Sequence, residues 1–319
     1  MSASESEEVV KGADAPPGFE IRVLGPVEVC WGGSVVDIGG VKARALVARL
    51  LIDRNLIVTV DRLVDSLWRD HEGPGAEIAL RSTISRLRKR LREAGGADLI
   101  VTRAPGYILN AAADVTDVFC FERLVTDGRH HLARGRPSEC IRLLRHAERM
   151  WRGQAYSEVR DEPFARAEAR RLEELLLSAV ETRIDAGLTL GRQQELVGEL
   201  ETLTAANPMR ERLWSQRMLA LYRYGRQAEA LRVFQDLRSV LVDELGIEPG
   251  HDVTWMEQAI LAQDPALDYP VPPERNEAPS APVSAAVARA GRPVLVPTRV
   301  HEGPLVGRTW ESEALARWW

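Results

Sequence analysis

The spacing of apolar residues changes twice within the first 113 residues, and these changes constrain the fold more than any other feature of the chain. Apolar and polar residues alternate from Phe19 to Ile38, which predicts strands joined by a turn at Gly32-Gly33. The period then becomes about 3.6, as in amphipathic helices, before alternation returns on both sides of a turn at Ala104-Pro105-Gly106. The predicted helices cover 41–51, 59–68 and 76–93, and the last two strands cover 99–102 and 107–110. This order predicts a small α+β domain over residues 19–113.

The third predicted helix has a narrow apolar stripe and a basic opposite face. At about 100° per residue, Leu80, Ile84, Leu87 and Leu91 fall close to one line, which we expect to face the core. Six basic residues lie between positions 81 and 92, with no acidic residue among them. The residues that point away from the stripe are Ser82, Ser85, Arg86 and Lys89, and one flank carries Arg81, Arg88 and Arg92.

This basic face has two interpretations. Charged helix faces are common, so a face that is simply solvated explains the pattern equally well. An α-helix also fits the major groove of B-DNA, where its outermost residues meet base edges and flanking arginines meet phosphates. The formal net charge of the chain is −5, so DNA binding would depend on this local patch. The preceding helix, together with a hairpin that carries Arg103 at its tip, favours a winged helix-turn-helix that binds DNA.

Residues 114–265 are predicted to be helical almost throughout. Gly191-Arg-Gln and Gly225-Arg-Gln recur at a spacing of 34 residues, which is the period of tetratricopeptide repeats. An all-α, tetratricopeptide-like helical-repeat domain of this kind has concave surfaces suited to proteins or peptides. Most of its apolar residues are nevertheless expected to pack against one another, and we assign Trp151, Trp214 and Trp255 to the core.

Composition excludes several other classes of protein. The three cysteines are far apart and form no C-x-x-C pair, and the N-terminus lacks the pattern of a signal peptide. No apolar run is long enough to span a membrane, so we expect a cytoplasmic protein. Nucleotide-binding, hydrolase and metalloprotease motifs are absent, and His130, His131 and His146 lack acidic or cysteine neighbours at metal-binding spacing. We therefore expect no enzyme, no catalytic residue, no cofactor and no metal.

Residues 19–113 resemble the winged helix-turn-helix of OmpR/PhoB-type regulators, and more closely that of the Streptomyces antibiotic regulatory protein family. The segments that resemble it are FEIRVLGPV (19–27), KARAL (42–46), LVDSLW (63–68), ISRLRK (84–89) and TRAPGY (102–107). The resemblance implies base contacts near Ser82 and Arg86. It implies phosphate contacts near Thr83, Arg88, Arg103 and Tyr107, and a four-stranded N-terminal sheet. Ser85 stands where a related regulator has a basic residue, so the resemblance gives no base for that position.

The helical residues resemble the bacterial transcriptional activation domain of the same family. The segments that resemble it include MWRG (150–153), PMRERL (208–213), GRQAEAL (225–231) and ELGIEP (244–249). The resemblance implies a transcription activator that binds repeated sites near promoters, forms a homodimer or oligomer on DNA, and recruits RNA polymerase through its sigma factor and alpha subunit. It also implies control of antibiotic or other secondary-metabolite genes.

The two ends of the chain have a different composition. Residues 1–18 are expected to form a disordered tail, and 266–304 a linker, because nine prolines fall between residues 265 and 304. Residues 305–319 resemble the start of the ATPase domain found in larger family members, cut off before its phosphate-binding loop. Two alternatives to a DNA-binding activator therefore stay open: a protein-interaction scaffold, and a nucleotide-switched regulator whose ATPase domain is missing here.

Overall fold

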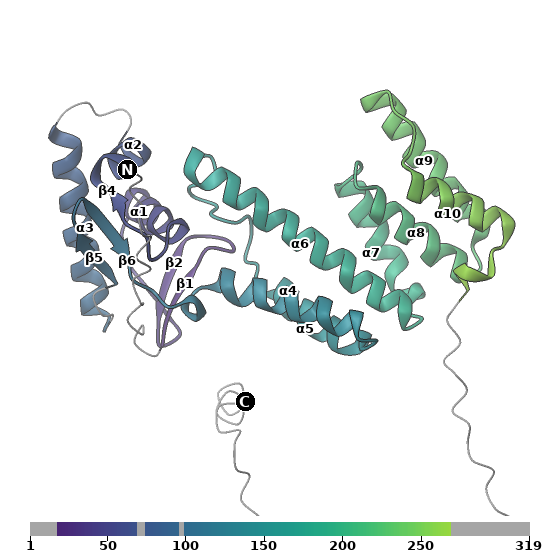
Figure 1. Ribbon diagram of the computed structural model, residues 1–319, viewed down its shortest axis with the longest axis horizontal. Helices are drawn as coiled ribbons and strands as arrows, with labels where there is room; N and C mark the ends of the chain where they lie inside the picture. Colours follow the sequence, from purple (N-terminus) through teal and green to yellow (C-terminus); the bar gives the residue numbers. More distant parts are fainter. Residues whose placement is uncertain (1–17, 69–73, 96–98, 269–319) are drawn as a thin grey trace, which may run out of the picture. The chain divides into compact units, whose positions relative to one another are not determined.

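The computed structural model describes residues 18–68, 74–95 and 99–268. The predicted tail (1–18, apart from Gly18), the segment 305–319 and nearly all of the predicted linker lie outside the described residues. The described chain forms one compact unit, with an α/β part followed by a helical part (Figure 1). The predicted fold class, a winged helix-turn-helix followed by a tetratricopeptide-like helical domain, is confirmed.

The α/β part contains two small antiparallel sheets around three helices. The first sheet has the order β1 (Phe19–Arg22), β2 (Glu28–Trp31) and β3 (Ser34–Val36). The expectation of four strands is therefore wrong for the described residues, because the chain after β3 turns directly into α1 (Val41–Ile52). The second sheet has the order β4 (Val58–Thr59), β6 (Gly106–Leu109) and β5 (Ile100–Arg103).

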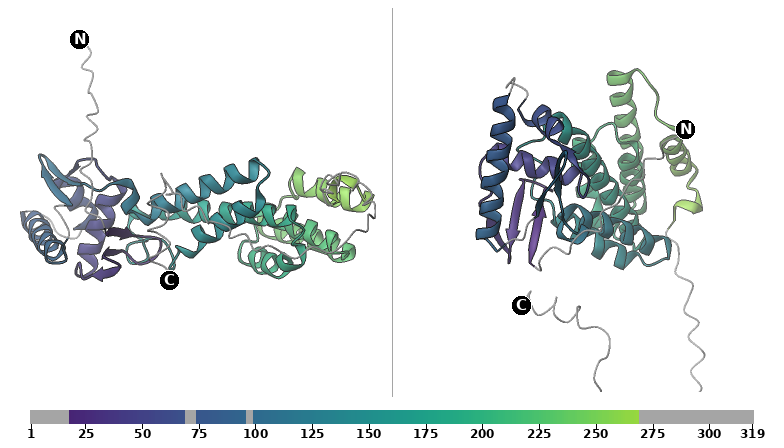
Figure 2. Two further views of the ribbon diagram at one scale, coloured as in Figure 1. Left: turned by 90° about the horizontal axis from the view of Figure 1, so that it is seen from below. Right: turned by 60° about the vertical axis from the view of Figure 1, so that its left-hand side comes forward.

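The helices α2 (Val60–Leu67) and α3 (Pro74–Glu93) complete this part. Helix α2 begins one residue later than predicted because Thr59 is its N-cap, and the Thr59 hydroxyl accepts a hydrogen bond from the Arg62 amide. Helix α3 packs its apolar stripe inward, and Leu80, Ile84, Leu87 and Leu91 are all at most 3% exposed. It runs along the side of the α/β part that faces away from the helical part (Figures 1 and 2).

The helical part consists of seven α-helices within the described residues. Their bounds are α4 (Asp117–Ala133), α5 (Pro137–Arg149), α6 (Pro163–Thr189), α7 (Gln193–Ala206), α8 (Glu211–Arg223), α9 (Gln227–Leu245) and α10 (His251–Ala262). Neighbouring helices pack in pairs, α4 on α5, α7 on α8 and α8 on α9. A 3₁₀ turn at Pro265–Leu267 follows, and Leu267 is buried against α8–α10, so the packed structure extends past residue 265.

The repeated Gly-Arg-Gln motif forms the same turn twice. Gly191 and Gly225 follow the ends of α6 and α8 with φ angles of +74° and +80°, a region that glycine adopts at low cost. The amide of Arg192 donates to the Gly187 carbonyl, and the amide of Arg226 donates to the Leu221 carbonyl. Each turn therefore satisfies carbonyls in the last turn of its helix by a Schellman motif, and the next helix begins two residues after the glycine.

The three tryptophans have different environments. Trp214 is 6% exposed, and Trp151 packs edge-to-face on Phe121 with ring centroids 5.5 Å apart, as expected for the core. The prediction for Trp255 is wrong, since this side chain is 45% exposed on α10. One continuous apolar core joins the α/β part to α4–α6, and it includes Leu46 of α1, Phe121 of α4 and Leu172 of α6.

Candidate nucleic-acid interface

Helix α3 presents a polar and basic face to solvent. Ser82, Ser85, Arg86 and Lys89 are exposed, and we call these four residues the outer face of α3. Arg81 and Arg92 on the flank are exposed as well. The apolar stripe on the other side fixes this orientation, because rotating α3 would expose four leucine and isoleucine side chains to water.

Arg86 differs from its basic neighbours. Arg81 pairs with Glu77 one turn earlier, and Lys89 lies 3.8 Å from Glu93. Arg92 donates from Nε to the Arg88 carbonyl at 3.3 Å. Arg86 has neither a hydrogen bond nor an ion pair with any residue that the structure describes. Its guanidinium is therefore available for an external acceptor such as the O6 and N7 atoms of guanine.

Arg88 points to the β5–β6 hairpin instead. Its Nε donates to the Ile100 carbonyl at 2.8 Å and its Nη2 to the Thr102 hydroxyl at 2.9 Å. The guanidinium also lies over the Tyr107 ring, 5.7 Å from its centroid. Arg88 thus fastens the hairpin, or wing, to α3, and much of its hydrogen-bonding capacity is already used within the fold.

Two residues expected near phosphates are buried. Thr83 is 7% exposed, and its hydroxyl donates to the Ala79 carbonyl at 2.8 Å. Tyr107 is 8% exposed beneath Arg88. Helical geometry explains the position of Thr83, which lies about 60° from the apolar stripe and so on the core side of α3. Arg103, in contrast, is exposed at the end of β5, where a wing would meet the nucleic-acid backbone.

We expect Arg88→Ala to lower the free energy of unfolding by about 1–2 kcal/mol, because two hydrogen bonds from a charged donor between α3 and the wing are lost. Urea unfolding followed by circular dichroism measures this change. Arg86→Ala is the matched control on the same helix and should leave the urea midpoint unchanged. An unchanged midpoint for Arg88→Ala would contradict the fastening role.

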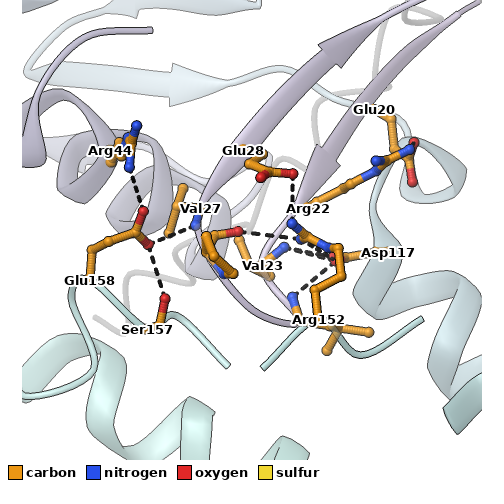
Figure 3. Close-up of polar contacts among 12 residues, drawn as sticks. Glu20, Arg22, Val23, Val27, Glu28, Arg44, Asp117, Arg152, Ser157 and Glu158 are labelled. Atoms are coloured by element: carbon orange, nitrogen blue, oxygen red, sulfur yellow. Dashed lines mark hydrogen bonds and ion pairs between the residues drawn. The ribbon is translucent and has the colours of Figure 1, made fainter. Parts of the chain in front are cut away.

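A cluster of polar residues attaches the N-terminal sheet to the helical part (Figure 3). Asp117, the first residue of α4, is 3% exposed and accepts hydrogen bonds from the amides of Val23 and Leu24 at 2.8 and 2.9 Å. Arg152, in the α5–α6 loop, lies 3.6 Å from Asp117 and 2.6 Å from Glu28. The amide of Arg152 donates in return to the Leu24 carbonyl.

Glu158 completes this cluster, and we call Asp117, Arg152 and Glu158 the interdomain clamp. The Glu158 carboxylate accepts from the Val27 amide at 2.8 Å and pairs with Arg44 of α1 at 2.6 Å. Burial alone would raise the pKa of Glu158, but the Val27 amide and the Arg44 guanidinium outweigh it and hold the pKa below its usual value. Burial raises the pKa of Asp117, against the opposing effect of the Leu24 and Val23 amides and of Arg152.

The sequence pattern did not single out the clamp or one further residue, Ile78. Ile78 lies on α3 and is 67% exposed, although its side chain is apolar. Its position on the helical wheel, about 160° from Leu80, was a usable signal for the exposed face. Asp117 offered no comparable signal, because its partners lie more than ninety residues away in the sequence.

The described residues contain no group of three or more histidine, cysteine, aspartate or glutamate residues placed to hold a metal ion. Within these residues, no helix combines the length and the apolar character needed to cross a membrane.

Comparison with known families gives two matches that follow one another along the chain. Residues 39–109 match the family described as "Transcriptional regulatory protein, C terminal". Residues 116–261 match the family described as "Bacterial transcriptional activator domain". The first match contains α3 and the wing, and the second contains α4–α9 and nearly all of α10.

Individual relatives cover most of the chain. The regulatory protein DnrI of Streptomyces peucetius is 36% identical over 279 residues, which are 85% of this chain and 100% of the relative. The regulatory protein AfsR of Streptomyces griseus is 36% identical over 79% of this chain, but over only 25% of its own length. A solved structure of EmbR from Mycobacterium tuberculosis, in complex with a low-affinity phosphopeptide, is 35% identical with a TM-score of 0.74. That match covers 78% of this chain and 66% of the EmbR chain.

Proposed function

The chain belongs to the Streptomyces antibiotic regulatory protein family of transcriptional activators, and from this premise we propose that it binds promoter DNA through α3 and the β5–β6 wing. The observation that carries the proposal is the outer face of α3, where an unpaired Arg86 stands beside the short side chains of Ser82 and Ser85. Short neighbours allow the helix to approach base edges closely, and Arg86 then donates two hydrogen bonds to a guanine.

The remaining basic residues divide into two roles. Arg81 and Arg92 on the flank of α3 and the wing residue Arg103 contact phosphates, which places α3 without specifying sequence, while Lys89 lies on the outer face with Arg86. Arg88 acts from inside the fold by holding the wing, including Tyr107, against α3, and the buried Thr83 bonds only to the Ala79 carbonyl within α3. Arg88 keeps an additional phosphate contact only through the guanidinium nitrogen that the wing leaves free.

The helical part supplies contacts to the transcription machinery in this proposal. It recruits RNA polymerase through the sigma factor and the alpha subunit while a homodimer or oligomer of the chain occupies repeated sites in the cytoplasm. The regulated genes are those of antibiotic or other secondary-metabolite synthesis, in keeping with the family. The interdomain clamp supports separate roles for the two parts, because a rigid attachment determines the position of the helical part when α3 is bound in the groove.

The test begins with a binding site selected from random double-stranded DNA by the full chain. Arg86→Ala is expected to weaken binding to that site about 10- to 100-fold and to relax preference at one G·C pair, because a bidentate contact is lost. Fluorescence anisotropy at several salt concentrations measures the affinity and its salt slope.

Arg232→Ala on α9 is the control, since Arg232 is equally charged and exposed but lies in the helical part. This variant should bind as the unchanged protein does. If the full chain selects no DNA and α3 instead captures an acidic protein, the scaffold alternative would be favoured. ATP binding by this chain would favour the nucleotide-switched regulator.

A further inference from the structure

Ile78 is the most exposed large apolar side chain in the part of the chain that the structure describes, at 67%. On a helical wheel with Leu80 at zero, Ile78 falls at about 160°, between Ser85 at about 140° and Lys89 at about 180°. It therefore lies on the same side of α3 as the outer face, at its N-terminal end and away from the apolar stripe.

The neighbours of Ile78 leave it uncovered. Ser82 follows one turn later and Ser85 two turns later on the same side of the helix, and both side chains are short. Isolated exposed apolar residues are common on protein surfaces, so exposure alone would mean little. Ile78 differs because it shares one face with the basic residues whose charge complements DNA. Any surface that those residues dock against will meet Ile78 too.

The chemistry of the major groove specifies the partner. Base edges there present hydrogen-bond donors and acceptors, and one apolar group, the C5-methyl of thymine. An isoleucine gains nothing from the donors and acceptors, but its burial against a methyl group removes apolar surface from water. Residues in the N-terminal half of a recognition helix are those that contact base edges in helix-turn-helix proteins.

We propose that Ile78 contacts the C5-methyl group of a thymine and specifies a T·A pair at one end of the bound site. The proposal rests on the proposed DNA binding by α3. Arg86 lies eight positions after Ile78, about 12 Å along the helix axis, so the two side chains recognise base pairs roughly three to four steps apart. Ile78 gives α3 an apolar contact at its N-terminal end that complements the guanine contact in its middle.

The experiment removes the methyl group and the side chain separately. Each thymine of the selected site is replaced in turn by deoxyuridine, which lacks only the C5-methyl, and affinity is measured for the unchanged protein and for Ile78→Ala. At one thymine we expect the unchanged protein to lose about three- to fivefold in affinity on replacement. Ile78→Ala should lose a similar factor on the thymine site and then be insensitive to deoxyuridine at that position.

The matched control is Leu261→Ala, which removes a 60%-exposed apolar side chain from α10 and should follow the unchanged protein at every position. If the affinity losses caused by Ile78→Ala and by deoxyuridine multiply at every thymine, the two changes act independently and the proposal is overturned. A selected site without thymine near the guanine would overturn it as well. In both cases Arg86→Ala would still weaken binding, so DNA recognition itself would stand. Loss of polymerase recruitment by Ile78→Ala at unchanged DNA affinity would assign this residue to a protein contact instead and would also overturn the proposal.

Discussion

Asp117→Ala is expected to lower the free energy of unfolding by about 3–5 kcal/mol, more than any exposed substitution on α3. The Asp117 carboxylate lies at the junction of the two parts of the chain and accepts the amides of Val23 and Leu24. Both donors belong to residues that are 0% exposed, so water cannot replace the lost acceptor. Removing the side chain leaves two buried N–H groups without a partner and takes one carboxylate away from Arg152.

A variant with nearly the same shape separates charge from packing. Asp117→Asn keeps one acceptor oxygen, which in the Oδ2 position still accepts from both amides, but it places an NH₂ group 3.0 Å from the Val23 amide and removes the charge near Arg152, and we expect it to cost about 1–3 kcal/mol. Urea unfolding of the full chain measures both changes. Asp127→Ala on the same helix is the control, because Asp127 is exposed and its removal should change the midpoint little. A midpoint for Asp117→Ala equal to that of Asp127→Ala would show that the clamp contributes nothing.

The consequence for function follows from the position of the clamp. The segment 23–27 contacts the α5–α6 loop through both backbone and side-chain hydrogen bonds, so the helical part moves with the N-terminal sheet. We expect Asp117→Asn to retain DNA binding at temperatures where the α/β part is folded, and to lose more activation than affinity.

Sequence periodicity predicted the local structure correctly where the residue types in the pattern themselves determine which side chains are buried or which backbone angles are allowed. The stripe from Leu80 to Leu91 and the exposed outer face follow from helical spacing alone, because burying four aliphatic side chains leaves a single orientation for α3. The Gly-Arg-Gln repeat likewise predicted two turns, since only glycine adopts the required positive φ at low cost. In both cases the physical cause lies within a few residues of the pattern.

Helical spacing and residue type do not show the environment that the tertiary fold gives a side chain. Arg88 belongs to the basic flank by its position on the wheel, yet the wing draws it to Ile100 and Thr102. Trp255 was assigned to the core because large aromatic residues are mostly buried, but the structure leaves it 45% exposed on α10. In the sequence, Asp117 has the position of an ordinary acidic residue in the first turn of a helix. Only the folded chain places the amides of residues 23 and 24 next to its carboxylate.

Gly106→Ala is the second substitution with a large expected effect, and we expect it to lower the free energy of unfolding by about 3 kcal/mol. A Cβ atom at Gly106 would lie 1.9 Å from the Val58 carbonyl oxygen and 2.7 Å from the Thr59 Cα. Both are backbone atoms of β4, so no side-chain rotation relieves the contact. Strands β4 and β6 must separate, or the whole wing must shift.

The displacement would reach the DNA-binding elements on both sides. Thr59 pairs with Gly106 and also caps α2, so moving β4 disturbs the start of the helix-turn-helix. The same hairpin contains the acceptors of Arg88, so moving β6 also loosens the attachment of the wing to α3. We therefore expect Gly106→Ala to lose DNA affinity as well as stability, unlike Asp117→Asn.

Gly198→Ala distinguishes this steric effect from the general consequences of replacing glycine. Gly198 lies inside α7 with open space around it, and alanine there should stabilise the protein by up to about 1 kcal/mol through its higher helix propensity. The two glycine variants should therefore move the urea midpoint in opposite directions. Equal midpoints for Gly106→Ala and the unchanged protein would mean that β4 and β6 do not approach as closely as described.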